Sequence, residues 1–120
     1  MNVLLIDDSR AMRMILKRTL AEVRALRGAT FSEAANGVEG LEAITAGDFD
    51  LVLCDWNMPE MDGITLLRTI RDQGENVTFG FVTSESTPVM YDTAMQAGAS
   101  FLVTKPFQAR NFELALERVG

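Results

Sequence analysis

Residues 51–59 read Leu-Val-Leu-Cys-Asp-Trp-Asn-Met-Pro, and this stretch decides how the chain is organised. Four apolar residues run directly into the carboxylate of Asp55, and Pro59 disfavours a helix immediately before it. Such an apolar run predicts a strand that is buried on both faces, as in a parallel sheet. Ligands bind beyond the carboxyl ends of the strands in such sheets, so we expect Asp55 to belong to a functional site.

Short apolar segments alternate with segments of helical periodicity along the rest of the chain. The pattern predicts an α/β fold, a flavodoxin-like doubly wound parallel sheet with helices on both faces. Residues 30–34 contain one large apolar side chain, Phe31, which favours an edge position and a strand order of 2-1-3-4-5. We expect one domain over residues 1–120. The predicted strands are residues 2–6, 30–34, 51–55, 78–83 and 101–104.

The helical segments carry apolar residues at intervals of three and four, as an amphipathic helix requires. Ser9 is placed to cap the first of them, and Pro88 fits the first turn of the fourth. We expect the first helix to bury Met12, Ile15, Leu16, Leu20 and Val23, and the second to bury Val38, Leu41 and Ile44.

Composition excludes several kinds of protein. The net charge is −6, which disfavours binding to a nucleic-acid backbone and favours cations or basic partners. Cys54 is the only cysteine and there is no histidine, so a disulfide, a thiolate metal site and a histidine base are all excluded. No apolar stretch approaches the roughly 20 residues that cross a bilayer, and the first residues lack a basic signal-peptide start. We expect a cytoplasmic protein that does not bind membranes.

Polar side chains stand where four of the predicted strands end: Asp7 and Asp8, Asp55, Thr83 and Lys105. A parallel sheet brings these ends to one edge. Two carboxylates about 4 Å apart repel each other by roughly 4 kcal/mol at an effective dielectric constant near 20. One lysine cannot neutralise three carboxylates, but a divalent cation can. Oxygen ligands suit Mg²⁺, which commonly binds one or two carboxylates together with a phosphate.

Each of these residues alone has an ordinary structural explanation. Two aspartates after a strand usually cap a helix or lie in a solvated turn, and a single lysine usually lies on the surface. Thr83 with the next serine is compatible with a hydroxyl-stabilised turn. The functional interpretation depends on their coincidence at the ends of different strands. Asp55 is then a candidate nucleophile, because carboxylates form aspartyl-phosphates, with Lys105 and Thr83 holding the phosphoryl oxygens.

At this point the motifs resemble the receiver domain of two-component response regulators, and most closely its CheY-type chemotaxis members. The resemblance covers essentially the whole chain and includes five motifs in order. It also implies the strand order 2-1-3-4-5 that the family shares. The motifs are Asp7-Asp8-Ser9, Asp55-Trp56-Asn57-Met58-Pro59 continuing to Met61-Asp62-Gly63, Thr83-Ser84-Glu85, Gln96-Ala97-Gly98-Ala99-Ser100 and Lys105-Pro106-Phe107.

The resemblance implies a phosphoacceptor that assists its own phosphorylation and dephosphorylation, rather than an enzyme. Asp55 would receive the phosphoryl group from a sensor histidine kinase. Mg²⁺ would be bound by Asp8, Asp55 and the backbone carbonyl of Asn57, with Asp7 acting through water. Lys105 would contact the phosphoryl group.

Further residues receive roles from the same resemblance. Thr83 would help Lys105 to hold the phosphoryl group, together with a cis peptide bond before Pro106. Asn57 and Glu85 occupy positions that tune self-dephosphorylation in the family. Because this sequence has no histidine, the phosphohistidine donor must be another protein.

The sequence departs from the family at the switch position. Family members usually carry Tyr or Phe three residues before the lysine, where this chain has Leu102 and its aromatic residue is Phe101. Neighbouring strand residues face opposite sides of a sheet. Either Leu102 is the switch and the coupling is altered, or a bulge lets Phe101 substitute. We favour Leu102, acting with Thr83.

The leading hypothesis is a phosphorylation-switched binding protein whose fourth helix, fifth strand and fifth helix contact a partner in chemotaxis. A flagellar motor switch protein and a phosphatase are the candidate partners besides the kinase. Two alternatives remain within the family: a phosphate sink or relay without an output partner, and a receiver excised from a larger regulator. A phosphatase with Asp7 as nucleophile is disfavoured because Ser9 stands where a second acid is needed.

Overall fold

The carboxyl ends of five parallel strands define one edge of a single sheet in the computed structural model, which describes residues 1–119. The strands lie in the order β2-β1-β3-β4-β5, as predicted. The edge position of β2 follows from its composition, because most of its side chains stay exposed. Gly120, the last residue of the predicted domain, lies outside the described residues. The strands are β1 (Asn2–Ile6), β2 (Thr30–Ala34), β3 (Leu51–Cys54), β4 (Thr78–Thr83) and β5 (Phe101–Thr104).

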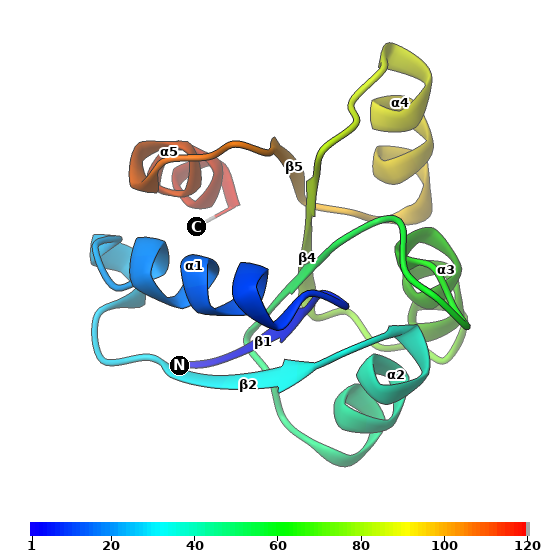
Figure 1. Ribbon diagram of the computed structural model, residues 1–120. Helices are drawn as coiled ribbons and strands as arrows, with labels where there is room; N and C mark the ends of the chain where they lie inside the picture. The colour runs from blue at the N-terminus through cyan, green and yellow to red at the C-terminus, as the bar shows by residue number, and fades with distance from the viewer. Residues whose placement is uncertain (120) are drawn as a thin grey trace.

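Helices cover both faces of this sheet. Figure 1 shows α1 and α5 on one face, and α2, α3 and α4 on the other. Local signals set where they begin: the side chains of Ser9, Asn36, Asp62 and Thr87 each accept a hydrogen bond from a backbone N–H in the first turn of the following helix. The helices are α1 (Arg10–Leu20), the short 3₁₀ helix η1 (Arg24–Leu26), α2 (Gly37–Ala46), α3 (Gly63–Asp72), α4 (Pro88–Ala97) and α5 (Ala109–Val119).

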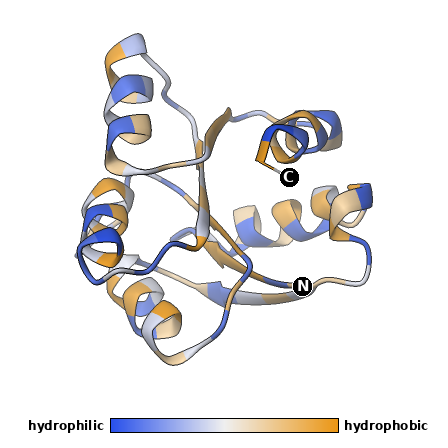
Figure 2. Cartoon of the chain, turned by 180° about the vertical axis from the view of Figure 1, so that it is seen from behind, coloured by the Kyte–Doolittle hydropathy of each residue, from blue (hydrophilic) through white to orange (hydrophobic). Residues whose placement is uncertain are grey.

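The sheet separates two hydrophobic cores. Leu4, Val52 and Phe79 point toward α2, α3 and α4, whereas Val3 and Leu53 point toward α1 and α5. In Figure 2 the central strands are the most hydrophobic part of the chain, and the helices show mixed colours because only their inner sides are apolar. This arrangement explains why the strand sequences are continuously apolar, since a strand covered on both faces has no solvent side.

Three details of the predicted helices were wrong. The first helix ends at Leu20, so Val23 is buried from the turn before η1 rather than from the helix. Ile15 is 46% exposed and Val38 is 37% exposed, although both fit the apolar period. Each sits at the border of its helix's apolar stripe, where periodicity alone does not decide whether a side chain turns inward.

No helix within residues 1–119 combines the length and the hydropathy that crossing a bilayer would require.

Candidate functional site

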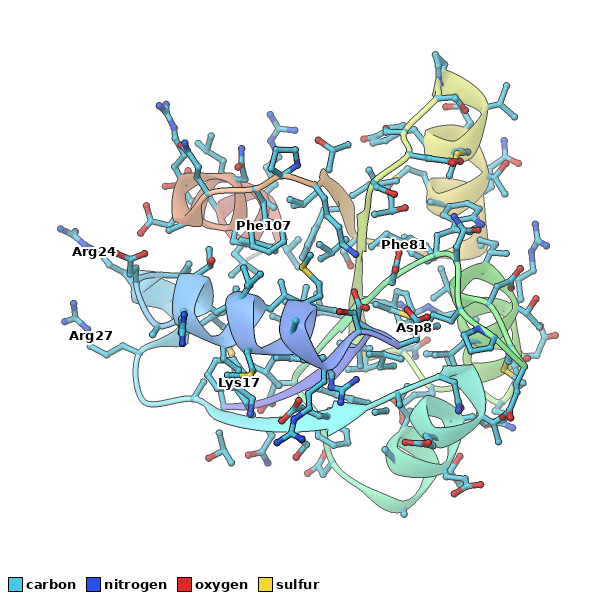
Figure 3. The ribbon with its side chains drawn as sticks, viewed as in Figure 1. Asp8, Lys17, Arg24, Arg27, Phe81 and Phe107 are labelled. Carbon is cyan, nitrogen blue, oxygen red and sulfur yellow. The ribbon has the colours of Figure 1, made fainter. Side chains whose placement is uncertain are left out.

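The registers of the strands bring the aspartates together at the carboxyl edge of the sheet. Ile6 of β1 pairs with Cys54 of β3, so the residues that follow them, Asp7 and Asp55, are neighbours. The backbone N–H of Asp55 donates to the carbonyl of Ile6 at 2.9 Å, which continues the ladder beyond the strands. Asp8 follows at the start of the turn into α1, and Figure 3 shows it at that edge. Two neighbouring strands therefore supply all three carboxylates.

Lys105 reaches this group from β5, at the far side of β4. Its Nζ lies 2.9 Å from Oδ2 of Asp7 and 3.3 Å from Oδ2 of Asp55. The second carboxylate oxygens are occupied by backbone donors: Oδ1 of Asp7 accepts from Ser9 N–H, and Oδ1 of Asp55 accepts from Trp56 N–H. The peptide bond between Lys105 and Pro106 is cis, as the resemblance implied. Residues about one hundred positions apart in the chain are thus held as one cluster.

Burial and the charge of the ion-pair partner shift the pKa values of Asp55 and Lys105 in opposite directions. Burial raises the pKa of Asp55 above its ordinary value, and neighbouring Asp7 adds to the rise while Lys105 opposes it. Burial by itself would lower the pKa of Lys105, but its hydrogen bond and attraction to Asp7 and Asp55 raise that pKa instead. Lys105 is therefore firmly protonated, and the Asp55 carboxylate is less stable in its charged form than a solvated one. A further cation close to Asp55 would favour the ionised form.

The donor set fits a hard divalent cation. Asp7, Asp8 and Asp55 each offer a carboxylate oxygen, and these oxygens all lie within 4.8 Å of one another. Ligands on opposite sides of Mg²⁺ are about 4.2 Å apart, given its bond lengths of about 2.1 Å, so small side-chain movements suffice. Asp7 is buried, Asp8 is exposed and Asp55 is intermediate, which leaves one side of the cluster open to solvent. The site can therefore hold a metal ion and admit a phosphorylated ligand.

The other predicted site residues lie in the loops around the cluster. Thr83 ends β4 with its side chain fully buried, and its carbonyl accepts a hydrogen bond from the backbone N–H of Lys105 at 2.8 Å. Its hydroxyl accepts a longer hydrogen bond, 3.4 Å, from the backbone N–H of Glu85. Asn57 and Glu85 are both exposed, in the loops that follow β3 and β4. The fold brings Thr83 next to Lys105 and leaves Asn57 and Glu85 accessible to solvent.

The two candidate switch residues face opposite sides of the sheet. The pairing of β4 with β5 is regular from Gly80–Phe101 to Thr83–Thr104, so the bulge that Phe101 would need is absent from these residues. Phe101 belongs to the core under α1 and α5, whereas Leu102 packs against the core under α2, α3 and α4. Thr83 follows Phe81 by two positions and shares that second face. Leu102 is thus on the same side of the sheet as Thr83.

Two residues next to the site were missed in the sequence. Arg13, inside α1, donates from Nη1 to the carbonyl oxygen of Asp7 at 2.6 Å and from Nε to Glu33 at 2.8 Å. A Cβ built on Gly63 would lie 2.3 Å from the carbonyl oxygen of Asp55, so only glycine fits there. An arginine on the inner side of the first helix was the available signal for Arg13, and Gly63 stood in the sequence only as part of a family motif.

Comparison with known proteins agrees with these motifs. The model of the response regulator receiver domain family matches residues 3–117. Chemotaxis protein CheY-3 of Vibrio cholerae serotype O1 is 36% identical, and the alignment covers 99% of this chain and 91% of that protein. Chemotaxis protein CheY of Pseudomonas aeruginosa is also 36% identical, with 99% and 95% covered.

Solved structures show the same architecture. The chemotaxis protein CheY4 of Vibrio cholerae is 29% identical, with a TM-score of 0.85 over 99% of this chain and 98% of that one. The receiver domain of the Francisella response regulator 1452 has the same TM-score, 0.85, at 25% identity and the same coverage.

Proposed function

This chain belongs to the family of response regulator receiver domains, and from that premise we propose that it is a CheY-type regulator phosphorylated on Asp55. The observation that carries the proposal is that Lys105 pairs with both Asp7 and Asp55. The carboxylates of Asp7, Asp8 and Asp55 converge at the same place. Residues 1–120 would form one receiver domain. The names of its relatives support a role in chemotaxis.

The proposed chemistry transfers a phosphoryl group from a phosphohistidine of a sensor histidine kinase. An Asp55 oxygen forms the new bond to phosphorus while the bond to the donor nitrogen breaks, and that nitrogen keeps the electron pair. Lys105 binds the phosphoryl oxygens with its ammonium group, and the buried Thr83 hydroxyl provides a second contact. Because these 120 residues contain no histidine, the donor histidine lies outside them.

The proposed cofactor is Mg²⁺. Asp8, Asp55 and the carbonyl of Asn57 would bind it directly, and Asp7 through water. When bound, the ion would offset the negative charge that gathers on the phosphoryl oxygens. The open side of the cluster leaves room for the incoming group. Asn57 and Glu85, exposed beside it, would set how fast water removes the phosphoryl group from Asp55.

The proposed output depends on Thr83 and Leu102. A phosphoryl group on Asp55 would draw the Thr83 hydroxyl toward it and shift the equilibrium of the surface formed by α4, β5 and α5. Leu102 shares the face of Thr83 and lines the hollow on this surface together with Tyr91 and Leu114. Phe101 is tied to the opposite core and would not move. A flagellar motor switch protein or a phosphatase would bind this surface.

A phosphate sink without an output partner is the second candidate, and Leu102 is the observation that favours it. Leucine lacks the aromatic ring whose rotation reports phosphorylation in the family. The two candidates differ in one measurement. Phosphorylation should change the affinity for a motor or effector protein in the first case and leave it unchanged in the second.

The central experiment is incubation with acetyl phosphate and Mg²⁺, followed by mass mapping of the modified residue. We expect one phosphoryl group on Asp55 and none in Asp55→Asn. Trp56 lies directly after Asp55 and packs on Phe81 at 4.8 Å between ring centroids, so its fluorescence should change with Mg²⁺ and with beryllofluoride. Asp8→Asn should weaken the Mg²⁺ response. Phosphorylation at another residue, or an unchanged spectrum with both ligands, would contradict the proposal.

A further inference from the structure

Asp8 is the carboxylate of the acidic edge that the fold holds least firmly. The side chains of Asp7 and Asp55 are tied by backbone donors and by Lys105. The Asp8 side chain is exposed, and within residues 1–119 it forms no hydrogen bond or ion pair. Its direction therefore depends on the backbone that carries it.

That backbone is fixed by Arg13. The Nη1 atom of Arg13 donates to the carbonyl oxygen of Asp7 at 2.6 Å. This carbonyl lies in the same plane as the N–H of Asp8, because the atoms of one peptide unit are coplanar. On the other side of Asp7, its N–H donates to the carbonyl of Ala34 on β2 at 3.1 Å. Arg13 thus sets the plane from which the Asp8 side chain departs.

Arg13 also closes the turn between β1 and α1. Its backbone N–H donates to the carbonyl of Ser9 at 3.0 Å, while its side chain binds the carbonyl of Asp7. One residue therefore holds both ends of the segment that contains Asp8. Within residues 1–119 no second donor to the Asp7 carbonyl oxygen is present, so no other side chain can replace Arg13 there.

Glu33 of β2 aims the guanidinium group of Arg13. The Nε atom of Arg13 lies 2.8 Å from Oε1 of Glu33, and the arginine side chain is only 14% exposed. Lys17 pairs with the second carboxylate oxygen of Glu33 and so holds this acid in place. The donors of a guanidinium group have fixed positions relative to one another. An arginine that binds Glu33 through Nε therefore presents Nη1 in a fixed direction, toward Asp7.

We propose that Arg13 is a positioning residue that sets how tightly the acidic edge binds a divalent cation, by fixing the turn that carries Asp8. The inference rests on the proposed cation site and assigns a residue outside its ligand set. Arg13 contacts a backbone carbonyl and no carboxylate of the edge. Removing a group that orients metal ligands in this way typically weakens metal binding by about 10–100-fold.

The charge of Arg13 by itself predicts the opposite result. This arginine is one hydrogen bond away from Asp7, and a positive charge at that place repels a bound cation. If Arg13 acted only through its charge, removing it would tighten cation binding. Positioning predicts weaker binding instead, so the direction of the change separates the two explanations.

The test measures the Mg²⁺ dissociation constant of the full chain from the fluorescence of Trp56. We expect Arg13→Met to raise this constant at least about ten-fold. At saturating Mg²⁺, acetyl phosphate should label Asp55 in the variant within about two-fold of the wild-type rate, because Arg13 acts on cation binding and not on the phosphoryl group. Labelling that stays slow at every Mg²⁺ concentration would contradict this assignment.

Lys17→Met is the matched control. It removes the same charge and the other cationic partner of Glu33, but Lys17 has no bond to Asp7. Figure 3 shows Lys17 beside β2, further from the carboxyl edge than Asp8. The Mg²⁺ dissociation constant of this control should stay within about two-fold of the wild-type value, because Lys17 orients no ligand.

Arg13→Lys keeps the inference testable if Arg13→Met does not fold. Lysine retains the charge but replaces the rigid fork of donors by one ammonium group, so we expect at least about three-fold weaker Mg²⁺ binding. Unchanged or tighter binding in the Arg13 variants, or an equal loss in Lys17→Met, would overturn the inference and leave the proposed function intact. A wild type without any response to Mg²⁺ would overturn the proposed function and this inference together.

Discussion

The carboxyl edge of the sheet and the core beneath α1 and α5 are built on opposite principles. The edge gathers Asp7, Asp8 and Asp55 around one Lys105, with like charges close together and partly removed from water. The core contains side chains such as Phe112 that are fully buried among apolar neighbours. Apolar burial stabilises the fold, whereas the acidic edge is held in place by strands whose stability comes from elsewhere. A site of this kind can be destabilised locally without losing its geometry.

Phe112→Ala should cause the largest change, and it should change stability only. Phe112 is fully buried and its ring packs edge-to-face on Phe107 at 5.2 Å, so we expect a loss of about 3–5 kcal/mol in the free energy of unfolding. Urea denaturation followed by circular dichroism measures the loss. Under conditions where the variant is folded, the response of Trp56 fluorescence to Mg²⁺ should persist. A lost response would mean that the geometry of the acidic edge depends on the packing of this core.

Lys105→Met should change both the rate of phosphorylation and the stability of the fold. Phosphorylation by acetyl phosphate should slow by about 10²–10³-fold, the usual effect of removing one donor that stabilises developing charge. Stability without Mg²⁺ should also fall, because Asp7 is buried and would lose its partner. Radiolabel incorporation gives the rate, and thermal unfolding gives the stability. A more stable variant would show that the cost of burying the Lys105 charge, rather than its attraction to Asp7, dominates the edge.

Gly80→Ala tests the contact between β4 and β5 that keeps Phe101 in its core. A Cβ on Gly80 would lie 2.1 Å from the ring of Phe101, so the ring must move and we expect a loss of about 1–3 kcal/mol. Adding Phe101→Leu should recover part of that loss, which a double-mutant cycle measures. Additive losses would show that the ring is not what excludes the methyl group.

Asp55→Asn should have the smallest effect on stability, and it should be favourable at neutral pH without divalent ions. Burial raises the pKa of Asp55 above its ordinary 3.8, so the native state favours the protonated carboxyl more than the unfolded state does. The stability that Asp55 contributes is therefore fully present when the pH is below the ordinary pKa of an aspartate. It is lost as the pH rises through the raised pKa of Asp55 in the native state.

Asparagine avoids the loss, so the variant should gain stability at about pH 7 and the gain should shrink as pH falls toward about 4. Thermal unfolding across this range gives the comparison. A variant less stable than the wild type at neutral pH would contradict the direction of the shift.

Local patterns identified most of the fold. The continuously apolar strand before Asp55, the cap at Ser9 and the weakly apolar segment around Phe31 predicted five parallel strands, and the family resemblance supported their order. Helix edges were predicted less well. Ile15 and Val38 fit the apolar period but remain exposed, because the facing element determines which border residues are covered.

The candidate site was predictable from where its residues stand in the chain. Asp7 and Asp8 follow the end of one strand, and Asp55 and Lys105 each follow the end of another. Parallel strands bring such ends to one edge of the sheet. The contacts of Arg13 with Asp7 and of Gly63 with the Asp55 carbonyl were not predictable. They depend on how α1 and α3 lie against the strand ends, which neither spacing nor composition specifies.

The sequence by itself determined the chemistry of this protein: which strand ends carry carboxylates, which carries the lysine, and that no histidine is present. Tertiary structure decided that Leu102, and not Phe101, shares the face of Thr83. It also decided that Arg13 and Lys17 pair with Glu33, whereas Arg10 and Arg18 form no ion pair within residues 1–119. The physical reason is that residue type sets what a side chain can do. Which neighbour it meets depends on the register of strands and the placement of helices, and both are fixed by contacts between residues far apart in the chain.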